Sequence, residues 1–168
     1  MLMSEVVKVI NVGIADMNIV RSPNRIRTAG LGSCVGVIIF DPFKEIAGMV
    51  HVMLPDSRIA TGSGQLNVAK YADTGVAELV SRLVHEGARL SFLKAKIAGG
   101  AQMFQSLSGN QIMKIGPRNV EAVKNMLNKL RIELLAEDCG GQNGRTIEFN
   151  PNTRVLSIRT VNKGMKEL

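Results

Sequence analysis

Two apolar runs separated by a short turn constrain the fold of this chain most strongly. Residues 35–40 and 46–51 have the length and the β-branched content of buried strands. The segment between them begins Asp41-Pro42, and aspartate suits the first position of a β-turn while proline suits the second. The pattern therefore predicts an antiparallel hairpin.

The turn also predicts a register for this hairpin. If Asp41 pairs with Lys44, then Cys34 lies directly opposite His51 on the same face. Opposed residues have Cβ atoms about 5 Å apart, which is the spacing that a thiolate–imidazolium pair requires. A slip of one residue or a bulge would separate the two side chains.

Cys34 follows a glycine-rich segment that is compatible with catalysis. A free thiol is largely protonated at neutral pH, so a nucleophilic cysteine needs a neighbouring base, and His51 can supply one. Gly30, Gly32 and Gly36 leave space for a substrate, and the amides near Ser33 and Cys34 can face a developing oxyanion. The alternative is a tight turn that carries an inert, buried thiol.

Five blocks of the sequence follow one another along the chain: residues 28–36, 51–55, 98–101, 115–119 and 138–145. These blocks resemble those of the CheD family, the chemoreceptor glutamine deamidases of chemotaxis, and the resemblance runs from about residue 10 to residue 161. It implies a cysteine-hydrolase fold similar to the catalytic domain of a toxin family that deamidates glutamine. It also implies that Cys34 is the nucleophile, that His51 is the general base and that Thr28 orients the imidazole, beside a substrate loop containing Gly32 and Ser33.

The activity that the resemblance implies is hydrolysis of a linear amide. Glutamines of methyl-accepting chemoreceptors would become glutamates with release of ammonia, through a thioester on Cys34 and without a metal or organic cofactor. Some members of the family also bind the phosphatase CheC, so CheC is a candidate partner. Two alternatives stay open: a non-catalytic regulator that binds chemoreceptors and a CheC-type phosphatase, and a general cysteine amidase or peptidase.

Two positions depart from the pattern of the family. Cys139 stands where many relatives have an aliphatic residue, and we expect a small apolar side chain there rather than a disulfide with Cys34. Arg154 follows Thr153 in the last predicted hairpin turn, where a glycine is usual.

Length and composition predict one compact domain over residues 1–168. The hydrophobic content of 45% argues against disorder, and we expect a cytoplasmic protein because neither a signal peptide nor a membrane-spanning run is evident. The net charge of +7 permits nucleic-acid binding, but an aromatic content of 4% leaves few stacking platforms, so we expect none. Arg21, Arg25 and Arg27 either attract an acidic helical substrate or form a solvated surface.

The remaining periodicity predicts two helices and further strands. One helix is expected over residues 65–86, with Val84 in its apolar stripe and Gly87 as its C-cap, and a second begins near Pro117. Strands are expected at residues 94–97, 132–135, 147–149 and 156–158. Together these helices and strands predict an α/β or α+β layered sandwich of mixed β-sheet covered by helices.

Overall fold

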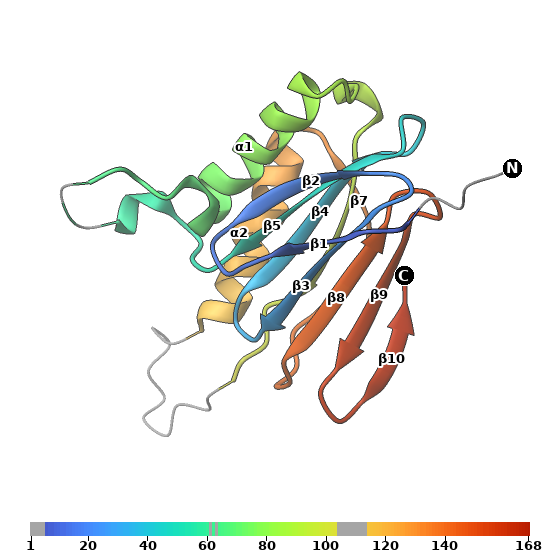
Figure 1. Ribbon diagram of the computed structural model, residues 1–168. Coiled ribbons are helices and arrows are strands. Elements are labelled where there is room, and N and C mark those ends of the chain that lie inside the picture. Colours follow the sequence, from blue (N-terminus) through green and yellow to red (C-terminus); the bar gives the residue numbers. More distant parts are fainter. Residues whose placement is uncertain (1–5, 61, 63, 104–113) are drawn as a thin grey trace, which may run out of the picture.

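A computed structural model describes residues 6–60, 62, 64–103 and 114–168 of the chain. Two α-helices and two β-sheets make up most of these residues (Figure 1). The elements are β1 (Val9–Val12), β2 (Met17–Arg21), β3 (Arg25–Leu31), β4 (Val35–Asp41), β5 (Ile46–Val52), α1 (Ala72–His85), β6 (Lys94–Gly99), α2 (Ile115–Lys129), β7 (Glu133–Cys139), β8 (Arg145–Asn150), β9 (Val155–Thr160) and β10 (Gly164–Glu167).

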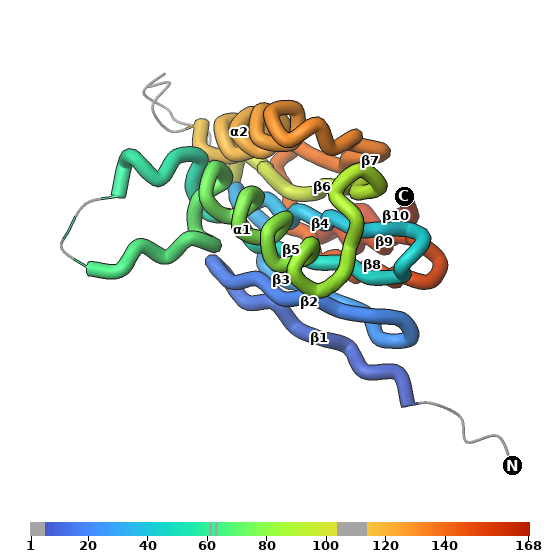
Figure 2. The backbone as a smooth tube through the Cα atoms, turned by 90° about the horizontal axis from the view of Figure 1, so that it is seen from above, coloured from blue at the N-terminus to red at the C-terminus, as the bar shows by residue number. Residues whose placement is uncertain are grey.

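The two sheets stack in three layers with the helices. Sheet A has the order β1-β3-β8-β9-β10, and sheet B has the order β2-β5-β4-β6-β7. Both sheets are mixed, because β1 runs parallel to β3 and β6 runs parallel to β7, whereas the other neighbouring strands are antiparallel. Helices α1 and α2 cover one face of sheet B, and sheet A packs on the other (Figure 2). The prediction of a mixed α+β layered sandwich is confirmed.

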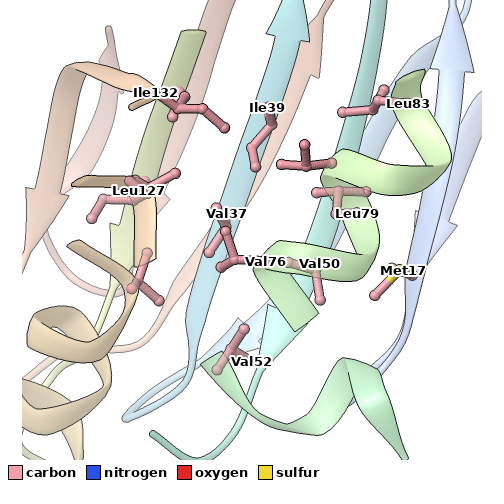
Figure 3. Close-up of a cluster of buried hydrophobic side chains, with 14 of the residues drawn as sticks. Met17, Val37, Ile39, Val50, Val52, Val76, Leu79, Leu83, Leu127 and Ile132 are labelled. Atoms are coloured by element: carbon pink, nitrogen blue, oxygen red, sulfur yellow. The ribbon is translucent and has the colours of Figure 1, made fainter. Parts of the chain in front are cut away.

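Strand β4 contributes side chains to both cores of the molecule. Val37 and Ile39 pack toward the helices, against residues such as Leu79 of α1 (Figure 3). Ile38 and Phe40, which alternate with them, pack between the two sheets. A strand that is covered on both faces needs apolar residues at consecutive positions, which explains why residues 35–40 form a continuous apolar run.

Helix α1 begins later than the sequence pattern predicts. Residues 65–71 lie outside it, because the chain before the helix is tied to the segment that follows β5. Leu54 and Tyr71 form an isolated parallel bridge, and the amide of Ala72 donates to the Leu54 carbonyl. This bridge holds Tyr71 in an extended conformation, so the helix starts at Ala72.

The end of α1 agrees with the prediction in its cap but not in its apolar stripe. Gly87 has a φ of 105°, its amide donates to the Val84 carbonyl, and the amide of Ala88 donates to the Leu83 carbonyl. These bonds form a Schellman cap, and the predicted C-terminal role of Gly87 is confirmed. Val84 is 43% exposed rather than part of the buried stripe, because the last turn of the helix directs it away from sheet B.

The other predicted elements are present. Pro117 lies in the first turn of α2. The predicted strand segments 94–97, 147–149 and 156–158 fall within β6, β8 and β9, and the segment 132–135 overlaps β7, which begins one residue later, at Glu133. The sequence pattern did not predict β1, β2, β3 or β10. None of these strands forms a continuous apolar run, because each contains exposed residues and β1, β2 and β10 have only four or five residues.

The hairpin of β4 and β5 is confirmed, but the predicted register is wrong. Asp41 pairs with Ile46, and the loop between them has four residues rather than two. Glu45, the last residue of this loop, has a φ of 50°, and Asp41 accepts hydrogen bonds from the amides of Phe43 and Lys44. The longer loop moves every cross-strand pair by two positions, so His51 lies opposite Gly36 instead of Cys34.

Candidate functional site

Cys34 lies in the connection between β3 and β4 and is half-buried. Two carbonyls around it are tied to the segment after β6, since the amide of Gly100 donates to the Cys34 carbonyl at 2.8 Å and the amide of Ala101 donates to the Gly32 carbonyl at 2.8 Å. Gly99, with a φ of 115°, permits this contact, because a Cβ atom there would lie 2.3 Å from the Cys34 carbonyl oxygen. The connection that carries the thiol is therefore held by its backbone.

His51 is fully buried in β5 and faces sheet A. Its pairing partner Gly36 faces the same way, because a Cβ atom at Gly36 would meet the side chain of Ile147 of β8. Alternation along β4 puts Cys34 on this face as well, diagonally across from His51. The register is not the predicted one, yet a shift of two positions keeps both side chains in the layer between the sheets, and Gly36 places no side chain between them.

Thr28 of β3 reaches His51 from the opposite sheet. Its hydroxyl lies 2.8 Å from His51 Nδ1 and donates to the Val12 carbonyl at 2.6 Å. A hydroxyl has one proton, and a carbonyl can only accept, so the bond to Val12 leaves the Thr28 oxygen as the acceptor for His51. His51 therefore carries its proton on Nδ1, and Nε2 keeps its lone pair.

The free nitrogen of His51 is available for proton transfer. Nε2 is buried and has no hydrogen-bond partner among the residues that the structure describes, so it makes no hydrogen bond with the Cys34 thiol here. Catalytic hydrogen bonds are often longer without substrate and become shorter in the substrate complex. The arrangement thus has a base with the correct tautomer on the same face as the thiol.

Burial sets the charge state of both groups. Burial raises the pKa of the Cys34 thiol above its ordinary value, and a hydrogen bond from the amide of Cys34 itself opposes this effect. Burial also lowers the pKa of His51 to about 4. Both directions favour a neutral thiol beside a neutral imidazole at neutral pH, rather than the ion pair expected from the sequence. Such a pair can act by transferring the thiol proton to His51 as the nucleophile attacks.

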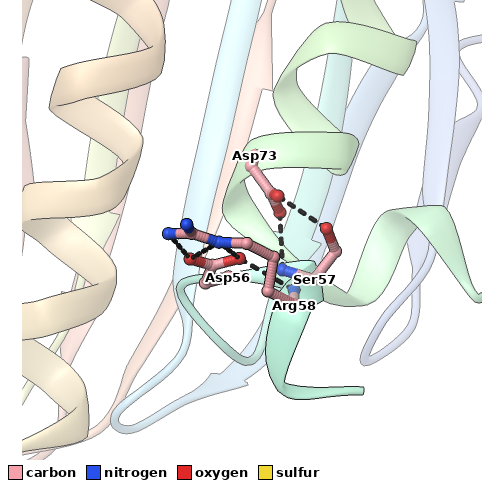
Figure 4. A network of polar contacts seen from close by, with 4 residues as sticks. All are labelled: Asp56, Ser57, Arg58 and Asp73. Carbon is pink, nitrogen blue, oxygen red and sulfur yellow. Dashed lines mark hydrogen bonds and ion pairs between the residues drawn. The ribbon is translucent and has the colours of Figure 1, made fainter. Parts of the chain in front are cut away.

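The segment that follows His51 is fixed to the start of α1. Asp73, in the first turn of α1, accepts hydrogen bonds from the Ser57 amide at 3.0 Å and from the Ser57 hydroxyl at 2.6 Å (Figure 4). Asp56 caps the short helical turn that contains Ser57 by accepting from the Arg58 amide. These bonds limit the movement of the chain next to the general-base candidate.

Sequence reasoning did not identify Asn119 of α2, which contacts both sides of this site. Its Nδ2 donates to the Ser33 carbonyl at 2.9 Å and to the Met53 carbonyl at 2.8 Å. Asn119 lies within the block of residues 115–119 that resembles the family, but no local pattern indicates that a residue 86 positions after Ser33 contacts it.

The three arginines considered as a substrate surface do not act as one group. Arg21 forms an ion pair with Glu86 beside α1, and Arg25 forms an ion pair with Glu148 on sheet A. Arg25 and Arg27 alternate along β3 with buried residues, so both lie on the outer face of sheet A, whereas Thr28 faces inward.

Cys139 ends β7 and is a free, half-buried thiol, as is Cys34, so no disulfide joins them. Its side chain packs against the core on the helix side of sheet B, as expected for a small apolar residue. Burial raises the pKa of Cys139 to about 12, which keeps it protonated. Cys139 is therefore a structural thiol.

The described ranges contain neither a metal-binding cluster nor a membrane-spanning helix. No group of three or more His, Cys, Asp or Glu side chains there is arranged to hold a metal ion. No helix in the same part of the chain is both long and apolar enough to span a membrane.

Comparison with known proteins identifies the family. The family model described as CheD chemotactic sensory transduction matches residues 53–160. The chemoreceptor glutamine deamidase CheD of Halalkalibacterium halodurans is 59% identical over 160 residues, which cover 95% of this chain and 98% of the relative. The Bacillus subtilis protein of the same name is 53% identical over 160 residues, covering 95% of this chain and 96% of the relative.

A more distant relative, the probable chemoreceptor glutamine deamidase CheD of Caldanaerobacter subterraneus, is 47% identical over 160 residues, covering 95% of this chain and 97% of the relative. The family model begins after His51, but alignments over 95% of the chain extend across the segment that contains Thr28, Cys34 and His51. The chain belongs to the CheD family.

Proposed function

We propose that the protein is a chemoreceptor glutamine deamidase in which Cys34 is the nucleophile and His51 is the general base. The observation that carries this proposal is the convergence of Thr28, Cys34 and His51 on the layer between the two sheets. The names of its relatives supply the activity, since those proteins are chemoreceptor glutamine deamidases. The enzyme class is an amidohydrolase that acts on a linear amide, here in chemotaxis.

In the first half of the reaction the thiol adds to the glutamine side chain. His51 Nε2 takes the proton from the Cys34 thiol while the sulfur forms a bond to the carboxamide carbon. The carbonyl oxygen becomes an oxyanion, which the amides of Ser33 and Cys34 can stabilise. The protonated His51 then gives its proton to the departing nitrogen, and ammonia leaves a thioester on Cys34.

In the second half the thioester is hydrolysed. His51 removes a proton from a water molecule, whose oxygen attacks the thioester carbon, and the C–S bond breaks. The sulfur leaves as thiolate and regains a proton from His51, so the product is glutamate and the enzyme is unchanged. Neither half requires a metal or an organic cofactor.

Thr28 acts on this cycle through the imidazole. By accepting from Nδ1 while donating to the Val12 carbonyl, it holds the proton of neutral His51 on Nδ1 and keeps Nε2 free as the base. It also keeps a favourable partner when His51 becomes imidazolium, because Nδ1 continues to donate.

Three further expectations belong to this proposal. The fold is similar to the catalytic domain of glutamine-deamidating toxins, the protein acts in the cytoplasm on the cytoplasmic domains of methyl-accepting chemoreceptors, and CheC is a candidate partner. The resemblance within the sequence supports each of these. We expect no nucleic acid among its ligands.

A comparison of activity with binding tests the proposal. The purified protein and its Cys34→Ser variant are each incubated with a chemoreceptor cytoplasmic fragment from the same organism, and released ammonia and retention of the fragment are measured. A Cys139→Ser variant is the matched control. We expect ammonia from the wild type and from Cys139→Ser only, with binding retained in all three. Binding without ammonia release from any of them would instead indicate a non-catalytic regulator.

A further inference from the structure

Asn119 connects the nucleophile segment to the base strand. It is fully buried in α2, and both hydrogens of its Nδ2 are used, one on the carbonyl before Cys34 and one on the carbonyl of Met53, two residues after His51. The carbonyls of Ser33 and Met53 are thereby held by the two hydrogens of one amide nitrogen. No other described side chain bonds to both segments.

The orientation of this amide follows from chemistry. Both partners are carbonyl oxygens, which can only accept, so the nitrogen of Asn119 must face them and its oxygen must face away. The Oδ1 atom is buried and has no partner in the described part of the chain. Leaving a buried acceptor unpaired is unfavourable, and the two bonds that Nδ2 donates offset this cost.

The bond to Ser33 also orients the next amide. In a trans peptide the C=O and the following N–H point in opposite directions. Because Asn119 holds the Ser33 carbonyl toward α2, the amide of Cys34 points away from α2. The bond from Ala101 to the Gly32 carbonyl turns the Ser33 amide away from Ala101 in the same manner.

Close packing at the start of α2 lets Asn119 reach both carbonyls. A Cβ atom at Gly116 would lie 2.3 Å from the Ala101 carbonyl oxygen, and one at Gly100 would lie 2.3 Å from a methyl carbon of Val120. These glycines allow the first turn of α2 to rest on the chain after β6, which is itself bonded to Gly32 and Cys34. Asn119 completes a set of three bonds to successive carbonyls of the nucleophile segment.

We propose that Asn119 is a positioning residue, which fixes the orientation of the peptide before Cys34 and sets the separation between Cys34 and His51. This proposal rests on Cys34 being the nucleophile. Asn119 touches no reacting atom itself. Its loss changes the rate of chemistry more than it changes substrate binding.

Three variants test this role. Asn119→Leu keeps the branched shape of the side chain but has no donor, and Asn119→Ser gives a second variant with a side chain too short to reach both carbonyls. Val123→Ala, four residues further along α2 and also fully buried, is the matched control because it removes buried packing but no hydrogen bond. Circular dichroism confirms that each variant is folded.

Each variant is assayed for deamidation of the chemoreceptor fragment, and Cys34 reactivity is measured with iodoacetamide across pH. We expect both Asn119 variants to lower kcat by about 10- to 100-fold while KM stays within about twofold, and to slow alkylation of Cys34. Val123→Ala should change kcat by no more than about twofold.

Retention of wild-type kcat by a folded Asn119 variant would overturn the proposal, as would an equal loss in Val123→Ala. Inactivity of the wild type would instead refute the proposed deamidation. In that case the alkylation rates alone decide whether Asn119 positions Cys34, since slower alkylation in the Asn119 variants than in Val123→Ala supports the role and equal rates refute it.

Discussion

Titration of His51 should couple the stability of the fold to pH. Burial lowers its pKa from 6.5 to about 4, so the unfolded chain binds a proton on this side chain at a pH where the folded chain does not. Above about pH 7 both states are neutral and His51 makes no contribution. As the pH falls below 6.5 the unfolded state gains protons first, and stability is lost.

The size of the effect follows from the two pKa values. The full difference between 6.5 and about 4 is worth about 3 kcal/mol, and about 2 kcal/mol of it is lost by about pH 5, where folded His51 is still mostly neutral. For a chain of 168 residues, 2 kcal/mol corresponds to a decrease in Tm of about 4–8 °C.

The contribution of His51 to the free energy of unfolding is measured by urea denaturation at about pH 7.5 and about pH 5. The wild type is compared with His51→Asn, whose side chain does not titrate in this range. The decrease in unfolding free energy between the two pH values should be about 2 kcal/mol smaller in His51→Asn than in the wild type. His85→Asn is the control, because His85 is exposed, and it should behave as the wild type. An equal pH dependence of wild type and His51→Asn would refute the burial of a neutral imidazole.

Three other substitutions test single features. Thr28→Val removes the hydroxyl and keeps the shape of the side chain. We expect the free energy of unfolding, measured by urea denaturation, to decrease by about 1–3 kcal/mol and kcat to decrease by about 100-fold. An unchanged kcat would show that Thr28 does not control His51. Gly99→Ala puts a Cβ atom against the Cys34 carbonyl at a φ of 115°. We expect the free energy of unfolding to decrease by about 3 kcal/mol. A thermal denaturation curve like that of the wild type would argue against this contact. Arg154 has a φ of 64°, a left-handed conformation in which a Cβ atom is unfavourable. Arg154→Gly removes this strain and should increase the free energy of unfolding by about 1 kcal/mol. A decrease in Tm would contradict the assignment of strain.

The hairpin of β4 and β5 could be predicted from the sequence because both strands are covered on two faces. Their apolar runs are continuous, so their positions are evident without knowledge of the rest of the fold. The register could not be predicted, because Asp41-Pro42 marks where the turn begins but nothing marks where it ends. Glu45 adopts a left-handed conformation that glutamate rarely takes, and this adds two residues to the loop.

The candidate site was only partly evident. Cys34 and His51 lie close together in the sequence, and a register error of two positions leaves both on the same face, so their association was predicted despite the wrong pairing. Thr28 came from the resemblance to the family, and its bond to His51 depends on contact between the two sheets. The position of Asn119 depends on how α2 packs, which a local pattern does not encode.

Arg154 illustrates a departure from the family pattern that the structure explains. The resemblance to the family predicts a glycine at this position, and Arg154 has the positive φ that favours glycine. Its carbonyl accepts from the buried ammonium of Lys96 at 2.6 Å, and its guanidinium donates to the Pro42 carbonyl at 3.2 Å. The hydrogen bond to Pro42 is available to arginine but not to glycine.

Peptide mass spectrometry of a chemoreceptor cytoplasmic fragment tests the central claim most directly. The fragment, from the same organism, is incubated with the wild-type protein or with Cys34→Ala, and each glutamine is then examined for conversion to glutamate. We predict conversion at specific glutamines by the wild type and none by the variant. Conversion by both proteins would contradict the assignment of Cys34 as nucleophile, and conversion by neither would contradict the deamidase function itself.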